Sequence, residues 1–359
     1  MLDMKERYDV VPSVLVPSEG ELADRCRENG IEVFCSKFYW RSYNNSFKVM
    51  LKGAAKQVLN RIKYFPEIFS LLKDKHFDIV HTNSSVIDTG IAIAQHFSVP
   101  HVWHIREYGI DDYNLYYVCP KSYVRAQYAK SDRVIAISRS IYDTYINERG
   151  LCSAQNTVCV PNGLKVSEAY SKTYLHDGRV NFCITGLIIP EKNQLLAVNA
   201  CAKLKAVTDN FTLHIIGRGS DDYIDSLKRT VSSLGLDGHV KFWGFRYDVN
   251  DVLKDMDVGL MLSKREAFGR VTVEYMMNYM PVIGMNTGAT PEIVTDGKSG
   301  FICPLDDADE IADRMYRFIM NPEILSSMGN YAREDAVKRF SLERNTDDIY
   351  RLYQEILKH

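Results

Sequence analysis

Short apolar runs rich in β-branched residues alternate with longer stretches of helical periodicity along most of the chain. Six such runs lie in the first half, at residues 10–17, 31–36, 78–83, 101–107, 133–139 and 157–163. Six more lie in the second half, at residues 180–186, 211–217, 240–245, 257–263, 281–286 and 300–305. Strands that alternate with helices are typical of parallel sheets covered by helices. The pattern therefore predicts an α/β protein.

A polar stretch with little periodicity separates the two sets of strands, at residues 165–179. A chain of 359 residues is long enough for two domains that each bury a core. We therefore predict a first domain at 1–164, a linker at 165–179 and a second domain at 180–340. The last helical pattern, at 341–359, follows the second domain without a strand of its own, and we expect it to pack back on the first domain.

The composition is that of a globular protein, with 46% hydrophobic and 25% charged residues. A net charge of -2 gives the whole chain no attraction to nucleic acid. Eight cysteines occur without a C-x-x-C pair, and several, such as Cys35 and Cys183, lie in apolar runs. We expect buried thiols in a reducing compartment, no structural zinc and no disulfide framework. Because no apolar stretch approaches 18 residues, we predict a cytoplasmic protein.

Polar residues and glycines follow many of the predicted strands. In open parallel sheets, ligands bind beyond the carboxyl ends of the strands. This placement favours a cleft enzyme over a scaffold protein. The residues concerned are His104, Asn162, Gly186, Gly217, Gly244 and Glu266.

Two glutamates, Glu266 and Glu274, flank the stretch EAFGRVTVE between a predicted strand and a predicted helix. Phe268 and Gly269 then lie at the strand-to-helix turn, where free backbone N–H groups and the positive helix end favour an anion. If the whole stretch were helical, the carboxylates would lie roughly 12 Å apart along the axis. Carboxylates accept hydrogen bonds from sugar and ribose hydroxyls. The arrangement indicates a nucleotide-diphosphate sugar, although such pairs also occur on solvated helices.

Several ordered motifs accompany this pair: VPNG at 160–163, PEKNQ at 190–194, FWGF at 242–245 and PVIG with GATPEIVTDGKSGFIC from Pro281 onward. HIRE at 104–107, at the end of the predicted strand that begins at His101, is a weaker match. With these motifs the chain resembles the retaining glycosyltransferases of family 4. The resemblance implies the GT-B fold, in which two Rossmann-like domains face each other across a cleft. It covers roughly residue 10 to the end of the chain.

The resemblance assigns donor-binding roles in the second domain. It implies that Glu266 contacts the donor sugar at the reacting centre and that Glu274 holds the ribose hydroxyls. The backbone amides of Phe268 and Gly269, with the loop at Gly186, would contact the diphosphate. Lys192 would bind phosphate as a point charge. Arg246, after the WGF strand, would contact the base or be an ordinary surface arginine.

In the first domain, the resemblance places His104 against the acceptor and the transferred sugar. A histidine near an apolar strand is also commonly a core residue. Arg106 and Glu107 either contact the acceptor or pair with each other, and both interpretations stay open.

Two features depart from the family pattern. The first strand of the family and its glycine-rich loop have no counterpart, and residues 1–8 resemble the end of the first helix. A central strand would then be missing, which should expose apolar flanks on its neighbours. Leu187 stands where the family carries an arginine that pairs with the diphosphate. The loss of that charge-assisted contact costs about 1.5–3 kcal/mol of donor-binding free energy. Arg246, Arg265 or Arg270 could compensate, and Arg270 is best placed at the helix start.

The segment from Lys37 to Lys75 is markedly basic, and Lys48, Lys52 and Lys56 repeat every four residues. This spacing predicts either a helix that contacts an anionic membrane surface or an ordinary solvated helix face. The aromatic residues at 39–47 would stack on sugars or pack on the core.

Together these features predict a retaining glycosyltransferase that moves a sugar from a nucleotide-diphosphate sugar to a glycan or lipid-linked acceptor, in polysaccharide or cell-envelope synthesis. Neither a metal nor another cofactor is expected. The alternative is a catalytically impaired glycosyltransferase-like partner or glycan-binding protein, which the two departures favour. A nucleotide-sugar epimerase of the same architecture fits the motifs less well.

Overall fold

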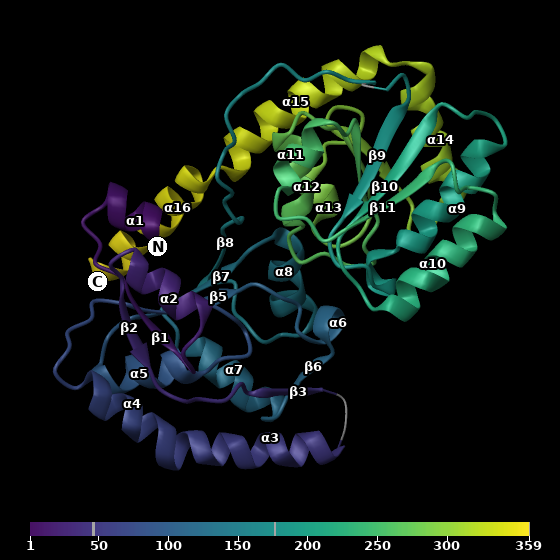
Figure 1. The fold of residues 1–359 in the computed structure, drawn as a ribbon. Coiled ribbons are helices and arrows are strands. Elements are labelled where there is room, and N and C mark those ends of the chain that lie inside the picture. Colours follow the sequence, from purple (N-terminus) through teal and green to yellow (C-terminus); the bar gives the residue numbers. More distant parts are fainter. Residues whose placement is uncertain (45–46, 176, 359) are drawn as a thin grey trace. The chain divides into compact units, whose positions relative to one another are not determined.

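The computed structural model describes residues 1–44, 47–175 and 177–358, and the side chains of these ranges except 44, 47 and 48. The chain forms two compact units, the first of residues 1–161 with 345–359 and the second of residues 162–344 (Figure 1). Both units are α/β structures with parallel sheets, so the predicted pair of Rossmann-like domains is confirmed.

All six strands predicted in the first unit are present, but they form two separate parallel sheets. Strands β1 and β2 make a two-stranded sheet, and β4, β5, β7 and β8 make a four-stranded sheet in that order. Their bounds are β1 Ser13–Val16, β2 Glu32–Cys35, β4 Val80–Thr82, β5 His101–Ile105, β7 Arg133–Ala136 and β8 Thr157–Cys159.

No described strand is hydrogen-bonded between β1 and β4. The half-buried side chains of Leu15 in β1 and Val80 in β4 pack in one apolar cluster with Phe34 and Ile93. The apolar flanks of these two strands are therefore partly covered by their own neighbours in this unit.

A third, antiparallel sheet of two strands was not predicted, β3 (Ser42–Asn44) with β6 (Leu115–Tyr117). Each strand has three residues, which is too short to show an alternating pattern in the sequence. The helices of the first unit are α1 Leu2–Arg7, α2 Glu21–Glu28, α3 Phe47–Leu59, α4 Phe65–Leu72, α5 Thr89–Phe97, α6 Ile110–Tyr113, α7 Lys121–Ala129 and α8 Arg139–Asp143, with π-helical turns η1 Asn60–Tyr64 and η2 Thr144–Glu148.

The C-terminal helix, α16 (Leu342–Leu357), packs on the first unit as predicted. Its residues Ile349, Leu352 and Ile356 bury their side chains against Val102 and Ile135 of the four-stranded sheet. Figure 1 shows α16 beside α1, where the chain begins. The rings of Tyr350 and Tyr8 stack there with centroids 3.8 Å apart.

The second unit contains one parallel sheet of six strands in the order β11-β10-β9-β12-β13-β14. The strands are β9 Val180–Thr185, β10 Phe211–Ile216, β11 Val240–Gly244, β12 Val258–Met261, β13 Val282–Met285 and β14 Gly300–Cys303, all as predicted. The helices are η3 Pro190–Lys192, α9 Gln194–Lys205, α10 Asp221–Ser233, α11 Val249–Lys254, α12 Arg270–Met277, α13 Thr290–Ile293, α14 Ala308–Met320 and α15 Glu323–Phe340.

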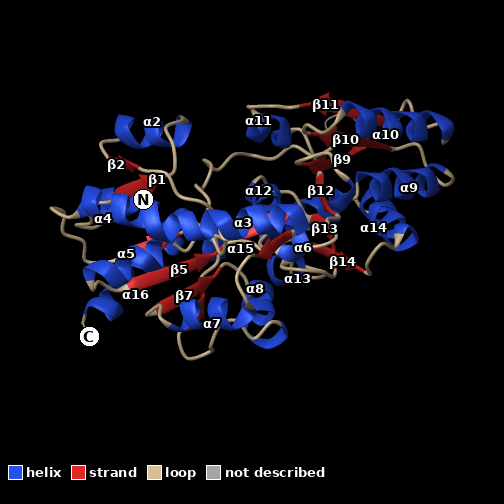
Figure 2. Cartoon of the chain, turned by 90° about the horizontal axis from the view of Figure 1, so that it is seen from below, coloured by secondary structure: helices blue, strands red, loops and turns tan. Residues whose placement is uncertain are grey.

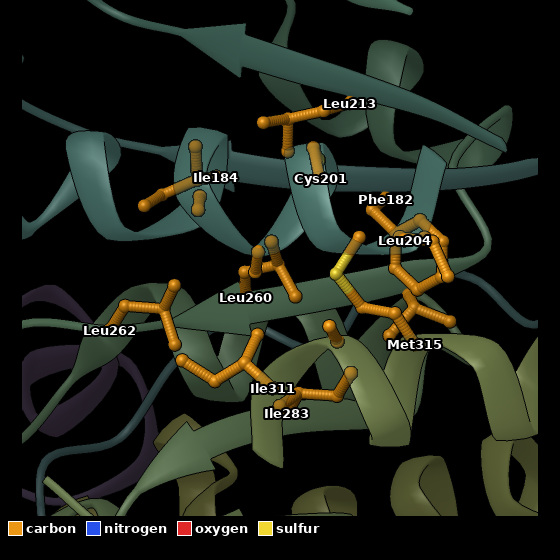
Figure 3. Packing of buried hydrophobic residues seen from close by; sticks show 14 of the residues in the cluster. Phe182, Ile184, Cys201, Leu204, Leu213, Leu260, Leu262, Ile283, Ile311 and Met315 are labelled. Carbon is orange, nitrogen blue, oxygen red and sulfur yellow. The ribbon is translucent and has the colours of Figure 1, made fainter. Parts of the chain in front are cut away.

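Helices cover both faces of this sheet, with α9, α10 and α14 on one face and α11, α12 and α13 on the other (Figures 1 and 2). Figure 3 shows how the core is filled between the sheet and the first set of helices. Phe182 and Leu260 from the strands pack there against Leu204 of α9 and Met315 of α14, and Phe182 and Met315 are fully buried.

The chain order in this sheet reverses between β9 and β12. Strands β10 and β11 extend the sheet on one side of β9, and β12 to β14 extend it on the other. The loops after β9 and β12 therefore diverge at this point and leave room for a ligand beyond the carboxyl ends of the strands. Lys192 and Glu266 lie in these two loops.

The segment at 165–179, expected to be a linker, is bonded to the second unit. Lys172 donates hydrogen bonds to the carbonyls of Leu253, Lys254 and Met256 at the end of α11, with distances of 2.6–2.9 Å. The Tyr174 hydroxyl donates to the carbonyl of Tyr279 at 2.7 Å. These contacts join polar side chains to distant backbone groups, which explains why the segment shows no periodicity.

The thiols are not all buried as expected. Cys183 is buried in β9, but Cys35 is exposed in β2. Cys35 follows the buried Phe34 in β2, so its side chain lies on the opposite face of the strand, where it is exposed. Among the described residues, no helix is both long enough and apolar enough to span a bilayer.

Candidate functional site

The loop after β9 brings Lys192 to the point where the strand order reverses. The loop ends in the short η3 helix, and Asn193 takes a left-handed conformation with φ of 60° before α9 begins. At the base of the loop, Gly186 and Gly217 approach so closely that a Cβ on Gly217 would lie 1.7 Å from the Gly186 carbonyl oxygen. Glycine at 217 therefore lets the ends of β9 and β10 converge beneath the site.

The loop after β12 carries Glu266, whose side chain is held from two directions. The Lys192 ammonium forms an ion pair with Glu266 Oε1. The Ser263 hydroxyl donates to the same oxygen at 2.9 Å. Lys192 and Glu266 are therefore brought together across the reversal point although 74 positions separate them.

The backbone of Glu266 is fixed by the segment that follows β13. Its carbonyl accepts a hydrogen bond from the Ala289 N–H at 2.9 Å. Gly288 lies against it with φ of 56°, and a Cβ there would be 2.5 Å from the Glu266 carbonyl oxygen. Sequence analysis missed Ser263 and Gly288 as supports of the site. The GAT motif contained the signal for Gly288, but its contact with Glu266 is not visible in sequence.

The predicted strand-to-helix turn is present at Phe268 and Gly269. Gly269 has φ of 83° and precedes the first residue of α12, Arg270. Phe268 is buried and packs edge-on against Phe340 with ring centroids 5.6 Å apart. The N–H groups of the first helical residues have no partner within the helix, so this end suits an anion. Because α12 begins only at Arg270, Glu266 lies in the preceding loop and the stretch is not helical throughout.

Glu274, in α12, has a half-buried side chain without a hydrogen-bond partner or ion pair among the described residues. Burial raises the pKa of the Glu274 carboxyl, and the charge of Arg270 partly offsets this effect. A buried carboxylate without a partner is costly in free energy. Glu274 is therefore a strong acceptor that a ligand hydroxyl can satisfy.

The arginines proposed to replace the missing one occupy different settings. Arg246 binds both oxygens of Asp248, at 2.8 and 2.6 Å, so its guanidinium is already engaged. Arg270 is exposed at the start of α12, and no carboxylate in the described part of the chain forms an ion pair with it. Leu187 exposes 49% of its surface in the loop after β9. Of the two arginines, Arg270 therefore has the guanidinium that is more accessible to a ligand.

In the first unit, His104 is almost fully buried in β5, with 1% of its surface exposed. Its Nδ1 lies 3.2 Å from His81 Nε2, and His81 Nδ1 lies 2.5 Å from the Tyr353 hydroxyl. Burial, with a smaller effect of Arg106, lowers the pKa of His104 well below its usual value. His104 is therefore neutral at pH 7, and its buried Nε2 has no partner among the described residues.

Arg106 and Glu107 do not pair with each other. One oxygen of Glu107 accepts hydrogen bonds from the Ser84 hydroxyl at 2.7 Å and from the Ser85 N–H and hydroxyl at 2.7 and 2.8 Å. Arg106 donates to Asn83 Oδ1. Both residues thus tie the end of β5 to the loop after β4, which corrects the pairing interpretation. These serine contacts have no signal in the sequence.

The membrane prediction rests on α3. Lys52 and Lys56 are exposed on this helix, and the side chain of Lys48 lies outside the described residues. No group of three or more His, Cys, Asp or Glu side chains arranged to hold a metal occurs in the described ranges.

Two family models match consecutive parts of the chain. A model described as Glycosyltransferase Family 4 matches residues 20–168, and one described as Glycosyl transferases group 1 matches residues 167–335. Together they cover residues 20–335, from the start of α2 to within α15, and leave out α1, β1 and α16.

Curated relatives match shorter segments. N-acetyl-alpha-D-glucosaminyl L-malate synthase of Bacillus anthracis is 29% identical over 161 residues, which are 45% of this chain and 42% of that protein. The lipopolysaccharide core biosynthesis glycosyltransferase LpsE of Rhizobium meliloti (strain 1021) is 26% identical over 167 residues, 46% of this chain and 47% of that protein. The alignments thus span less than half the length of these relatives.

The solved structure of Anabaena Alr3699/HepE in complex with UDP superposes with a TM-score of 0.80 and 19% sequence identity, over 99% of this chain and 94% of that one. At this identity the match establishes the fold, which is GT-B. The two domain matches, which between them cover residues 20–335, support a glycosyltransferase of the group 1 and family 4 type.

Proposed function

We propose that the protein is a retaining glycosyltransferase that moves a sugar from a nucleotide-diphosphate sugar to the hydroxyl of a glycan or lipid-linked acceptor. One observation carries this proposal. At the reversal point of the second sheet, Lys192 is paired with Glu266 while Glu274 has no partner in the described chain. This arrangement offers a cation for the diphosphate and carboxylates for hydroxyl groups on either side of it.

Donor binding then exchanges partners around Lys192. The diphosphate competes with Glu266 for the ammonium group, because phosphate oxygens carry more charge than a single carboxylate. Glu266, held by Ser263 and by its own backbone, becomes available to accept hydroxyls of the donor sugar. Glu274 accepts the ribose hydroxyls, which satisfies its buried carboxylate. Neither step requires a metal ion.

Rupture of the glycosidic bond leaves negative charge on the diphosphate. Lys192, Arg270 and the amides at the start of α12 stabilise this charge, and groups positioned in advance are the effective ones in catalysis. Arg270 takes the place of the arginine that Leu187 replaces. In the retaining path, the acceptor approaches from the side of the leaving group, and the departing phosphate receives the acceptor proton.

The first unit supplies the acceptor side. His104 is neutral and its Nδ1 contacts His81, so its Nε2 is the ring nitrogen that serves a sugar hydroxyl without adding a charge. Arg106 contributes a cation at the end of β5. Its bond to Asn83 fixes its direction.

The names of two similar proteins support a proposal for the donor and for the biosynthetic role. HepE was crystallised with UDP and with UDP-glucose, so we propose a uridine-diphosphate sugar as donor. LpsE carries the name of a lipopolysaccharide core enzyme, and we propose a role in polysaccharide or cell-envelope glycan synthesis at the cytoplasmic side.

Helix α3 suits peripheral attachment to an anionic membrane surface. Leu51 and Val58 of α3 expose 54% and 57% of their surfaces and lie seven residues apart, on one side of the helix. Ile62 of the adjoining η1 turn exposes 71% of its surface. Lys52 and Lys56 flank this apolar stripe. Apolar side chains with lysines beside them are typical of helices that lie in the membrane interface.

Liposome sedimentation tests the membrane proposal. Binding to vesicles with anionic lipid should weaken with salt and with Ile62→Glu, whereas Leu71→Glu, at another exposed apolar position, is the matched control. Equal binding to neutral vesicles, or an unchanged Ile62→Glu variant, would contradict it.

The transferase proposal is tested by incubating the protein with a panel of UDP and GDP sugars and measuring released nucleotide. We expect slow release from one donor, and its loss in Glu266→Ala. Glu334→Ala, at an exposed position of α15, should keep the wild-type rate. Absence of both release and nucleotide binding would favour the non-catalytic partner instead.

A further inference from the structure

A pocket of about 290 Å³ lies in the first unit, between the segment before β3 and helix α3. Its walls include Tyr39, Trp40 and Tyr43 on one side and Lys52 and Lys56 on the other, and these five residues define the lysine–aromatic pocket. Ligand pockets typically have volumes of about 300–1,000 Å³, so this one suits a single sugar unit with a substituent.

The segment that lines this pocket carries only positive charges. Residues 33–66 contain seven lysines and arginines and neither aspartate nor glutamate. No carboxylate of the described chain forms an ion pair with Lys52 or Lys56. Because they are four residues apart on α3, their side chains are neighbours on one helix face. Two adjacent ammonium groups without counter-charges favour an anion that can contact both, and lysine serves phosphate as a point charge.

The aromatic wall offers a different kind of contact. Trp40 leaves 54% of its surface exposed although it is a large apolar side chain. Tyr43 stands beside it in β3, its ring 5.9 Å from that of Tyr116. Exposed aromatic rings present a broad apolar face with polar tips. A sugar ring likewise combines apolar C–H faces with polar hydroxyl groups at its edge, so the two can stack.

Buried polar side chains fix the backbone of this wall. Asn60, fully buried at the start of η1, accepts from the Tyr39 N–H and donates to the Tyr39 carbonyl, both at 2.9 Å. Gln57 of α3 donates to the Trp40 carbonyl at 2.8 Å. π-helical turns such as η1 are frequent at functional sites. The wall is thus held in one conformation before any ligand binds, which lowers the entropic cost of binding.

Arg41 anchors the same segment on its other side. Its guanidinium donates to the Ser85 carbonyl at 3.0 and 2.8 Å and lies 4.4 Å from the Trp103 ring centroid. Arg41 is fully buried whereas the neighbouring Trp40 exposes 54% of its surface, so the two side chains leave the backbone in different directions. The pocket is therefore a built feature of the fold.

We propose that the lysine–aromatic pocket binds a sugar phosphate, with the phosphate between Lys52 and Lys56 and the sugar ring against Trp40 and Tyr43. Resting on the glycosyl transfer proposed above, this assignment names the acceptor class, a glycan that carries a phosphate next to a sugar. Such a group occurs in soluble sugar phosphates and in lipid-linked glycans. The pocket accommodates the same chemistry from either source.

Calorimetric titration of the full chain with glucose 1-phosphate and N-acetylglucosamine 1-phosphate tests the pocket. Free glucose, N-acetylglucosamine and inorganic phosphate serve as comparison ligands. We expect the sugar phosphates to bind more tightly than either part alone. Lys52→Gln and Lys56→Gln should each weaken binding about tenfold, the loss of one charge-assisted contact. Lys63→Gln, which removes an equally exposed lysine outside the pocket, should have no effect.

Trp40→Ala separates the two parts of the ligand. It should weaken sugar phosphate binding about tenfold, close to the effect of one stacked ring, and leave inorganic phosphate binding unchanged. Vesicles of phosphatidylcholine with and without a polyprenyl-phosphate-linked sugar distinguish the lipid-linked source from the soluble one. Equal binding to phosphatidylcholine vesicles with and without that lipid, together with calorimetric binding of sugar phosphates that is no tighter in wild type than in Trp40→Ala, would overturn the pocket assignment.

Glu266→Gln, which tests the donor site in the second unit, should retain full sugar phosphate binding. If donor turnover fails while the pocket binds sugar phosphate, the transferase proposal falls and the pocket stands. If donor turnover is present and wild-type protein binds neither sugar phosphate, or if both lysine variants bind like wild type, the pocket assignment is wrong.

Discussion

At the scale of single residues, the two glutamates that flank the turn differ in their electrostatic state. Glu266 is neutralised by Lys192 and bonded to Ser263, whereas Glu274 is half-buried and has no partner in the described residues. A donor that takes Lys192 for its diphosphate changes the surroundings of both. In the ligand-free protein, the carboxylate of Glu266 is therefore paired and that of Glu274 is not.

Replacing Lys192 by alanine should reduce affinity for UDP by about 10- to 100-fold. This corresponds to the loss of one charge-assisted phosphate contact, about 1.5–3 kcal/mol. Calorimetric titration with UDP measures the change. Lys228→Ala, at an exposed position of α10, is the control and should bind UDP like wild type. Unchanged affinity in Lys192→Ala would remove this residue from the diphosphate site.

Replacing Glu274 by glutamine should stabilise the ligand-free protein and weaken UDP binding. Burial raises the pKa of Glu274 in the folded state, so the folded state disfavours its charged form. Below the ordinary pKa of about 4.3 the carboxyl is protonated in both states and costs nothing. As the pH rises above that value, the wild type loses stability relative to the variant.

Thermal unfolding at pH 7.5 and at pH 4 measures this effect. We expect the variant to have a higher Tm than the wild type at the higher pH, because it carries no charge that burial disfavours. The gain should vanish at the lower pH. A variant less stable than wild type at both pH values would show that Glu274 has a structural partner.

The sequence alone predicted the strand-to-helix turn at Phe268 and Gly269, with Glu266 before it and Glu274 after it, because a strand, a turn and a helix follow each other within a few residues. It did not show that Lys192 pairs with Glu266, since that contact joins two loops 74 positions apart. Glu107 was hard to place for the same reason, because its serine partners lie about 22 residues earlier on a neighbouring strand end.

At the scale of elements, glycines let the strand ends of the second unit approach each other. Gly288 is the clearest case, because its backbone lies against that of Glu266 and its φ is 56°. The loop after β13 thereby supports the loop after β12. The position of the Glu266 carboxylate depends on a neighbouring element that does not itself contact the donor in our proposal.

Gly288→Ala should lower both stability and donor turnover. The left-handed conformation alone costs alanine about 1–2 kcal/mol, and the new Cβ would displace the Glu266 backbone. Tm and nucleotide release measure the two effects. Gly238→Ala is the matched control, because a Cβ there has no atom within 4 Å and no positive φ is involved. Normal turnover in Gly288→Ala would show that the loop tolerates the shift.

The pattern of the sequence predicted all twelve strands of the parallel sheets, since each lies within an apolar run that turn residues flank. It missed β3 and β6, whose pairing depends on contacts with Arg41 and Val118 backbone groups rather than on a pattern of their own. It also did not predict that β1 and β2 form a separate sheet, because strand pairing is a property of the folded unit.

At the scale of the whole molecule, the chain passes from the first unit to the second and returns with α16. The return is stabilised by an apolar stripe on α16, which includes Leu352, against the sheet of the first unit. The sequence predicted this helix but placed the first boundary at 164, where the structure divides at 161. The segment after it has no apolar pattern, so its attachment through Lys172 and Tyr174 could not be foreseen.

Leu352→Ala should destabilise the first unit by about 2–4 kcal/mol through the cavity it leaves. Differential scanning calorimetry should then show one lowered transition, assigned to the first unit. Leu325→Ala, a fully buried leucine of the second unit, should lower the other transition instead. If both variants lower the same single transition equally, the two units unfold together and their stabilities are not separable.

The central claim is that a nucleotide sugar binds where β9 and β12 diverge, with its diphosphate at Lys192 and the start of α12. The most direct measurement is a crystal structure of the protein with UDP or its UDP-sugar donor. The account predicts the diphosphate within hydrogen-bond distance of Lys192, the ribose hydroxyls at Glu274 and the Lys192–Glu266 pair broken. Nucleotide bound elsewhere, with Lys192 still paired to Glu266 and Glu274 still without a partner, would contradict it.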